Sequence, residues 1–254
     1  MKPSEPVIYD VAGGIATLTM NRPHNRNALS AELINGLGDR LQEAAADADV
    51  RFIVLTHTGS TFCAGADLKG DGSGERPRYN LPEILNIMQN GDKPVIGKIS
   101  GHCMGGGVGL AAACDLSIAM EDIAIGFTEV RIGVAPAIIS VVCLPKMREG
   151  DAMDLFLSGE KISGIRAAEV GLVNKAVPRA DYERACDGLI GKLARGGPLA
   201  LMACKSLVRR VSAMERNAAF EWTAKLSADL FQSEEAAEGI AAFREKRPAA
   251  WVED

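Results

Sequence analysis

The segment GHCMGGGVGLAAACD, residues 101–115, decides the fold. It follows an apolar run at residues 95–99 that is typical of a buried strand, and it leads into small residues typical of a closely packed helix. The glycine triplet at residues 105–107 stands where the helix begins, so its free backbone amides can face an anion. The segment therefore predicts an α/β unit with an anion-binding turn.

Two other interpretations of these glycines stay open at this point. Glycine-rich turns between a strand and a helix are often only tight connections. Residues 107–112, GVGLAA, also satisfy the GxGxxG/A pattern of dinucleotide-binding loops. That pattern normally begins at the end of the strand, whereas about seven residues separate Ile99 from Gly107.

A second segment of the same character is TFCAGADLK, residues 61–69. It follows an apolar strand predicted at residues 52–56, and the small residues 64–66 leave the backbone uncovered. Together with the glycine triplet it could supply two amide donors to one developing oxyanion.

The candidate acid lies in GFTEVRIGVAP, residues 126–136. Glu129 comes between an apolar strand and an apolar turn that contains proline, so partial burial and a raised pKa are expected, as a general acid or base requires. The alternative is a solvated glutamate paired with Arg131.

Strands and helices alternate as far as residue 127. The pattern predicts a hairpin across Gly13 and Gly14, and a helix that Ser30 caps. From about residue 138 helices dominate, with residues 172–177 as the one late strand and a last helix that begins after Ser233. The fold class is therefore α/β, with a core at residues 1–195 and a helical region at residues 196–254.

Composition and local motifs exclude several classes. The 254 residues are 47% hydrophobic and 24% charged with a net charge of −5, which argues against disorder and against a broad nucleic-acid or anionic-membrane surface. The sequence contains no run of about 18 apolar residues, which a membrane-spanning helix would need. The three histidines lack metal-ligand spacing, and neither a GxSxG elbow nor a GxxxxGK[ST] loop occurs.

The sequence predicts a cytoplasmic protein, because its six scattered cysteines include no CxxC pair and its first residues lack the apolar core of a signal peptide. The polar residues 69–80 are expected to form a mobile loop beside the site.

Five blocks in order and spacing make the sequence resemble the crotonase (enoyl-CoA hydratase/isomerase) superfamily over nearly the whole chain. They are RPHNRNAL at residues 22–29, the three segments quoted above, and SEEAAEGIAAFREKRPAAW at residues 233–251. The resemblance implies a spiral of ββα units and a C-terminal helical region used in assembly into a homotrimer or a hexamer. It also favours an oxyanion element over a dinucleotide loop.

The resemblance further implies an acyl-CoA substrate and no separate cofactor. The thioester carbonyl would lie between the backbone amides of Ala66 and Gly106, with Glu129 as the acid/base. Coenzyme A would lie against a set of five residues: Arg26, Ala28, Ala64, Asp67 and Leu68. Phe243 and Lys246 are similar to C-terminal positions that reach coenzyme A in many members.

The reaction stays open. Hydratases of the best-known type carry a second glutamate at the position of Gly109, and dienoyl-CoA isomerases carry an aspartate where Ala137 occurs. The block EVRIGVAPAIIS is similar to hydratases of branched or carboxylated enoyl-CoAs, such as methylglutaconyl-CoA, so a lyase is favoured. A Δ-isomerase that moves a proton from C2 to C4 and a CoA-binding protein without catalysis remain the alternatives.

Overall fold

A six-stranded sheet forms the main layer of the structure, a computed structural model that describes residues 5–68 and 77–252. The first two strands form an antiparallel hairpin, and the later neighbours pair in parallel. The spatial order is β1-β2-β3-β5-β7-β10. The strands are β1 (Val7–Ala12), β2 (Ile15–Met20), β3 (Phe52–His57), β5 (Val95–Ile99), β7 (Leu116–Met120) and β10 (Lys175–Val177).

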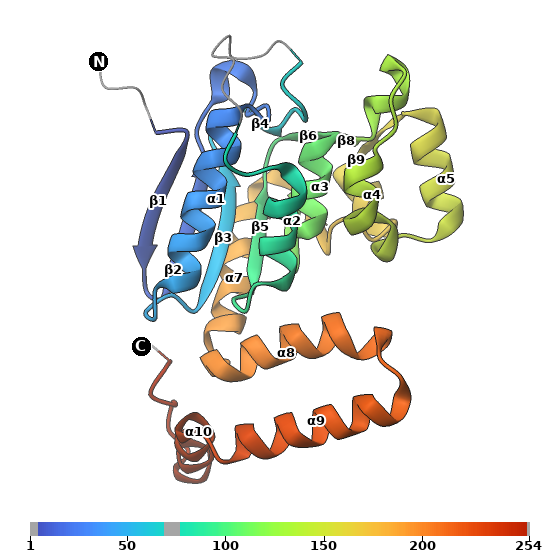
Figure 1. Ribbon diagram of the computed structural model, residues 1–254. Coiled ribbons are helices and arrows are strands. Elements are labelled where there is room, and N and C mark those ends of the chain that lie inside the picture. The colour runs from blue at the N-terminus through green and yellow to red at the C-terminus, as the bar shows by residue number, and fades with distance from the viewer. Residues whose placement is uncertain (1–4, 69–76, 253–254) are drawn as a thin grey trace.

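A second sheet of four short strands lies next to one end of the first (Figure 1). Each of its first three strands follows directly on a strand of the large sheet, and a helix comes next, which repeats a ββα unit along the chain. The fourth strand pairs antiparallel with the third. The strands are β4 (Thr61–Cys63), β6 (His102–Met104), β8 (Ala124–Gly126) and β9 (Lys161–Ser163).

Most of the helices pack against the two sheets, and the last three lie apart from them. In Figure 1, α1 and α2 lie against the large sheet, α4 and α5 flank the small one, and the last three helices form a separate layer. The helices are α1 (Ala31–Ala46), α2 (Leu81–Asn90), α3 (Gly106–Ala113), α4 (Ala137–Cys143), α5 (Glu149–Ser158), α6 (Gly164–Glu169), α7 (Tyr182–Ala194), α8 (Pro198–Arg210), α9 (Arg216–Phe231) and α10 (Glu234–Glu245). Short 3-10 turns are η1 (Pro23–Asn25), η2 (Thr128–Ile132), η3 (Leu144–Lys146), η4 (Arg179–Asp181) and η5 (Val211–Ala213).

Local sequence signals explain the element boundaries. The side chains of Ser30 and Ser233 accept hydrogen bonds from backbone amides in the first turns of α1 and α10, as predicted. Gly13 and Gly14 both have positive φ in the hairpin turn. The late strand is shorter than expected, at Lys175–Val177, and β9 was not predicted, because three residues give no measurable alternation of hydrophobicity.

Small and aliphatic residues fill the core between the layers. The face of α1 that carries Leu33, Leu37 and Leu41 is buried against the sheet, and every described residue of α3 after Gly106 is buried. Five of the six cysteines are buried, all six are free thiols, and Cys204 is the exposed one. The cysteines therefore pack as small apolar residues.

One buried ion pair ties the C-terminal helices to the core. The Lys205 ammonium on α8 donates to the carbonyls of Met88 (2.7 Å) and Lys93 (2.9 Å). It also pairs with the Asp115 carboxylate at 2.9 Å. The second oxygen of Asp115 accepts from Arg209, one turn further along α8. These contacts join α8 to the strand-bearing part, whereas no residue of α9 is buried.

Replacing Lys205 by Met is expected to destabilise the protein by about 3 kcal/mol, because two carbonyls lose their donor and the Asp115 carboxylate loses one of its two cations. Both tryptophans, Trp222 and Trp251, lie in the C-terminal region. Urea unfolding followed by tryptophan fluorescence should therefore show a larger loss than unfolding followed by circular dichroism. Lys225→Met, which removes an exposed pair with Asp229, should change stability by less than about 0.5 kcal/mol. Equal effects of the two variants would contradict the anchoring role of Lys205.

Candidate active site

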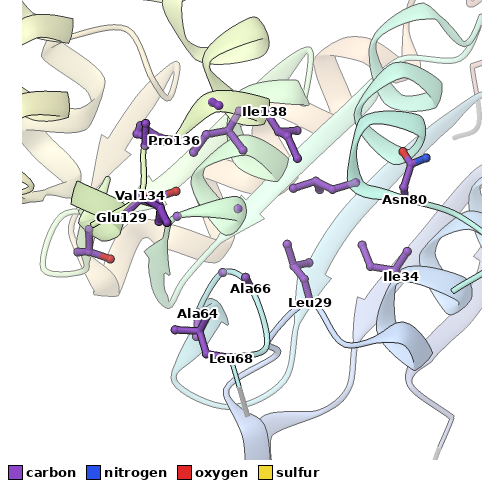
Figure 2. A pocket seen from close by; sticks show the side chains of 18 of the residues that line it. Leu29, Ile34, Ala64, Ala66, Leu68, Asn80, Glu129, Val134, Pro136 and Ile138 are labelled. Atoms are coloured by element: carbon purple, nitrogen blue, oxygen red, sulfur yellow. The ribbon is translucent and has the colours of Figure 1, made fainter. Parts of the chain in front are cut away.

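A cavity of about 530 Å³ opens where the two glycine-bearing segments meet the turn that carries Glu129. Figure 2 shows Glu129 and Val134 on one side, Leu29 and Ile34 on the other, and Ala64, Ala66 and Leu68 along an edge. The lining comes from five parts of the described chain, at residues 29–34, 64–68, 77–81, 105–106 and 128–139. Most of these side chains are apolar. The site is thus a hydrocarbon-lined cavity with few polar groups.

The two predicted amide donors lie where two backbone segments almost touch. A Cβ placed on Gly65, which has φ +88°, would lie 3.0 Å from the Met104 carbonyl and 3.3 Å from the Gly106 nitrogen. Gly106 is the first residue of α3, so its amide has no acceptor within the helix. Within the described residues, neither the Gly106 nor the Ala66 amide donates a hydrogen bond to the protein. Both residues line the same cavity.

Short strands hold these segments in place. β4 and β6 pair in parallel, with Cys63 opposite Cys103 just before the two turns. The Leu29 amide donates to the Gly65 carbonyl at 2.8 Å, and the Ala64 amide donates to the Arg26 carbonyl at 3.1 Å. The backbone around the donors is therefore fixed before any ligand binds.

Glu129 lies in η2, directly after β8, at the edge of the cavity. Its side chain reaches Gly105, where an added Cβ would lie 3.1 Å from Oε1, and Gly105 also has positive φ. Oε2 is buried and has no hydrogen-bond partner among the described residues. Burial raises the pKa of the Glu129 carboxyl above its ordinary value.

Arg131 does not pair with Glu129. Its guanidinium donates to the carbonyls of Gly159 (3.0 Å) and Ser158 (3.3 Å) and forms an ion pair with the Glu160 carboxylate. The alternative of a solvated Glu129 paired with Arg131 is therefore wrong, because the arginine is turned toward the end of α5.

The predicted coenzyme-contact residues divide into two groups. Ala64 and Leu68 line the cavity, and Leu68 is 76% exposed at its rim. Arg26, Ala28 and Asp67 lie on the same two hydrogen-bonded segments, outside the cavity lining. Arg26 is an exposed cation with φ +58°, and its segment is held by neighbouring Asn27, whose buried amide donates to the carbonyls of Thr58 and Thr61.

Two further predictions concern the C-terminal coenzyme-contact positions and the loop at residues 69–80. Phe243 and Lys246 lie on and after α10, at the far end of the molecule from β4 and β6, so within this chain they do not reach the site (Figure 1). Residues 69–76 of the expected loop lie outside the described residues. The remainder of that loop contributes Pro77, Tyr79 and Asn80 to the cavity.

The dinucleotide pattern has a structural explanation. Gly107 and Gly109 are buried inside α3, and a Cβ on Gly107 would lie 2.5 Å from the Cys63 carbonyl. These glycines let the helix pack closely, and the intervening strand β6 separates them from the end of β5. They therefore do not form a phosphate-binding turn.

Sequence reasoning missed several apolar side chains that line the cavity. Leu29, Ile34, Leu81 and Ile139 come from three of the five segments, at residues 29–34, 77–81 and 128–139. Each is an ordinary apolar residue in its own segment, so only the tertiary arrangement identifies it as part of the site.

Comparison with known proteins identifies the family. A sequence model described as enoyl-CoA hydratase/isomerase matches residues 10–254. The chain belongs to the enoyl-CoA hydratase/isomerase family. It is 33% identical over 244 residues to a protein of Thermus thermophilus named as an enoyl-CoA hydratase, covering 93% of this chain and 96% of that one. It is also 32% identical over 237 residues to the 2,3-dehydroadipyl-CoA hydratase of Escherichia coli, covering 92% and 93%.

Solved structures of the family share the fold. The structure of an enoyl-CoA hydratase from Mycobacterium smegmatis superposes with a TM-score of 0.89 at 28% identity, over 97% of this chain and 98% of that one. The predicted crotonase-like fold is therefore confirmed. Within the described residues, none of the helices is long and apolar enough to cross a membrane. The same residues contain no group of three or more His, Cys, Asp or Glu side chains that could hold a metal ion.

The raised pKa of Glu129 predicts a pH-dependent effect on stability. A carboxyl whose pKa is higher in the folded state binds its proton more tightly there, so its unfavourable contribution develops as the pH rises through the folded pKa. Glu129→Gln should therefore stabilise the protein at pH 8, and the gain should vanish toward pH 4, where both the folded and the unfolded state hold the proton. Thermal unfolding of both proteins across this range measures it.

Glu160→Gln is the matched control, because Glu160 is exposed and paired with Arg131. It should stay within about 0.5 kcal/mol of the wild type. A Glu129→Gln variant that is less stable than the wild type at pH 8, or a gain that does not depend on pH, would contradict an unpaired buried carboxylate.

Proposed function

We propose that the protein is an enoyl-CoA hydratase, a lyase that adds water across the double bond of a 2-enoyl-CoA thioester. The observation that carries the proposal is that two unpaired amides and one partly buried carboxyl face the same cavity. Thioester enolates place negative charge on the carbonyl oxygen, which is the group that two such amides would stabilise. Each fixed donor of this kind contributes roughly 3 kcal/mol to a transition state.

In this proposal the amides of Ala66 and Gly106 hold the thioester oxygen. Protonated Glu129 gives its proton to C2, a water molecule adds its hydroxyl to C3, and the remaining proton of that water restores Glu129. The direction of the pKa shift supports this role, because burial raises the pKa of Glu129 and so favours the protonated form that gives its proton to C2. The reaction uses no separate cofactor, since coenzyme A enters as part of the substrate.

We infer that coenzyme A lies along the segments that carry Arg26, Ala28, Ala64, Asp67 and Leu68. The exposed cation of Arg26 would give an acidic protein a local contact for the phosphates. The six free cysteines are consistent with a reducing compartment, so we propose a cytoplasmic location.

A second candidate is an enoyl-CoA Δ-isomerase. The observation that favours it is that Gly109 carries no side chain and is covered by Ile139, so Glu129 is the only carboxyl among the described residues that line the cavity. One carboxyl is enough to move a proton between C2 and C4.

Glu129→Gln should lower turnover of a 2-enoyl-CoA by about 10²- to 10⁴-fold, because the amide cannot transfer a proton. Binding of a saturated acyl-CoA should change by less than about threefold. Exchange of C2 protons with D₂O, followed by NMR, measures the proton transfer itself. Wild-type exchange in Glu129→Gln would show that another group is the acid.

Product analysis separates the two reactions. Crotonyl-CoA converted to 3-hydroxybutyryl-CoA supports the hydratase, whereas a 3-enoyl-CoA converted only to its 2-enoyl isomer supports the isomerase. A protein that binds acyl-CoA and converts neither would be a binding protein.

We also infer that the chain assembles as a homotrimer or a hexamer through the helical region at residues 196–254. Between α8, α9 and α10 lies an apolar cavity lined by Leu207, Leu226 and Leu230, and at its rim Phe220 and Phe231 are 62% and 74% exposed. Such a surface favours burial in an interface. Sedimentation equilibrium should give three or six copies, and a monomer at micromolar concentration would contradict the assembly.

A further inference from the structure

One wall of the cavity is a contact between α3 and α4 that leaves no free space. A Cβ built on Gly109 of α3 would lie 2.3 Å from Ile139 Cγ2 and 2.9 Å from Ile139 Cβ on α4. Ile139 lines the cavity and is only 2% exposed. The side chain of Ile139 therefore stands directly between the α3 backbone and the cavity.

This contact keeps Ile139 from moving away from a ligand. Its Cβ is branched, so few side-chain rotamers are available, and the Gly109 backbone closes the space behind it. Close-packed interiors transmit displacement rather than absorb it. The position of the Ile139 side chain consequently sets the width of the cavity at this wall.

The rest of the lining carries little charge. Among the described residues that line the cavity there is no Lys, Arg or His, and Glu129 is the only ionisable carboxyl.

Two polar side chains of the lining, Tyr79 and Asn80, form their hydrogen bonds with other parts of the protein. The Tyr79 ring packs on Gly38 and its hydroxyl donates to Asp39 at 3.4 Å, while the Asn80 side chain caps α2 by accepting from the Glu83 amide at 2.9 Å.

A charged acyl chain would meet an unfavourable environment here. A terminal carboxylate would lose its water, find no cation among the described lining residues, and share the cavity with Glu129. An aliphatic chain loses nothing comparable and buries apolar surface.

We propose that the site selects an uncharged aliphatic acyl chain and that Ile139, held by Gly109, is the specificity-determining residue that limits branching of that chain. This inference rests on the proposed acyl-CoA function and adds the acyl class to it. The paired residues act as one device, because the absence of a side chain at position 109 is what admits Ile139 at its present place.

The test is a double-mutant cycle with kcat/KM measured for unbranched crotonyl-CoA and branched 3-methylcrotonyl-CoA. Ile139→Ala should raise the branched-to-unbranched ratio about tenfold, a typical effect of one or two methyl groups in a pocket. Gly109→Ala should push Ile139 into the cavity and lower that ratio at least tenfold. The double variant should return to within about threefold of the wild type, because the new methyl group fills the space that Ile139 leaves.

Val141→Ala is the matched control. Val141 is on the same helix, is 72% exposed and does not line the cavity, so its ratio should equal that of the wild type. Should Gly109→Ala fail to fold, Ile139→Ala and Ile139→Val still decide the question through a graded change in the ratio. An unchanged ratio in both, with normal turnover of crotonyl-CoA, would overturn the role of Ile139.

Calorimetry separates this inference from the proposed function. Butyryl-CoA should bind at least tenfold more tightly than glutaryl-CoA, which carries a terminal carboxylate, and this measurement needs no turnover. Equal affinities would overturn the selection against charge. No binding of either thioester would overturn the acyl-CoA function itself.

Discussion

The close approach of the backbone at Gly65 to the backbone at residues 104–106 is the constraint on which the site depends. Even a methyl group at position 65 would lie 3.0 Å from the Met104 carbonyl, and φ at Gly65 is +88°, a region that side chains avoid. Ala66 and Gly106, which belong to these two segments, both line the cavity. The close approach also depends on the short pairing of β4 with β6, which in turn follows from the ββα repeat. A change in this contact would move both donors at once.

Much of this arrangement could be predicted from the sequence, and the reasons are local. The hairpin, the capped starts of α1 and α10, and the α3 helix each depend on residues close together in the chain. Glu129 could be singled out because an acid between apolar runs is unusual. The sequence could not place the three-residue strands β4, β6 and β9, which exist only because a neighbouring strand pairs with them.

The orientation of long side chains could not be predicted from the sequence either. Arg131 is two residues from Glu129, and an ion pair between them is what proximity in sequence favours. In the structure the guanidinium instead contacts the carbonyls at the end of α5 and the Glu160 carboxylate. Those partners are 27 to 29 residues away, so no local pattern could reveal them. The result is a carboxyl that keeps a buried, unpaired oxygen, which an adjacent arginine would have satisfied.

The cavity lining has two parts, which differ in how well they tolerate substitution. One part consists of main-chain groups whose positions depend on glycines, so few substitutions there leave the geometry intact. The other part consists of aliphatic side chains from α1, α2 and α4, which can be exchanged for others of similar volume at small cost in stability. Ile139 is one of these aliphatic side chains, but its position depends on a glycine, Gly109, just as the positions of the main-chain groups depend on glycines. It therefore couples the width of the cavity to the packing of α3, the helix whose first residue, Gly106, also lines that cavity.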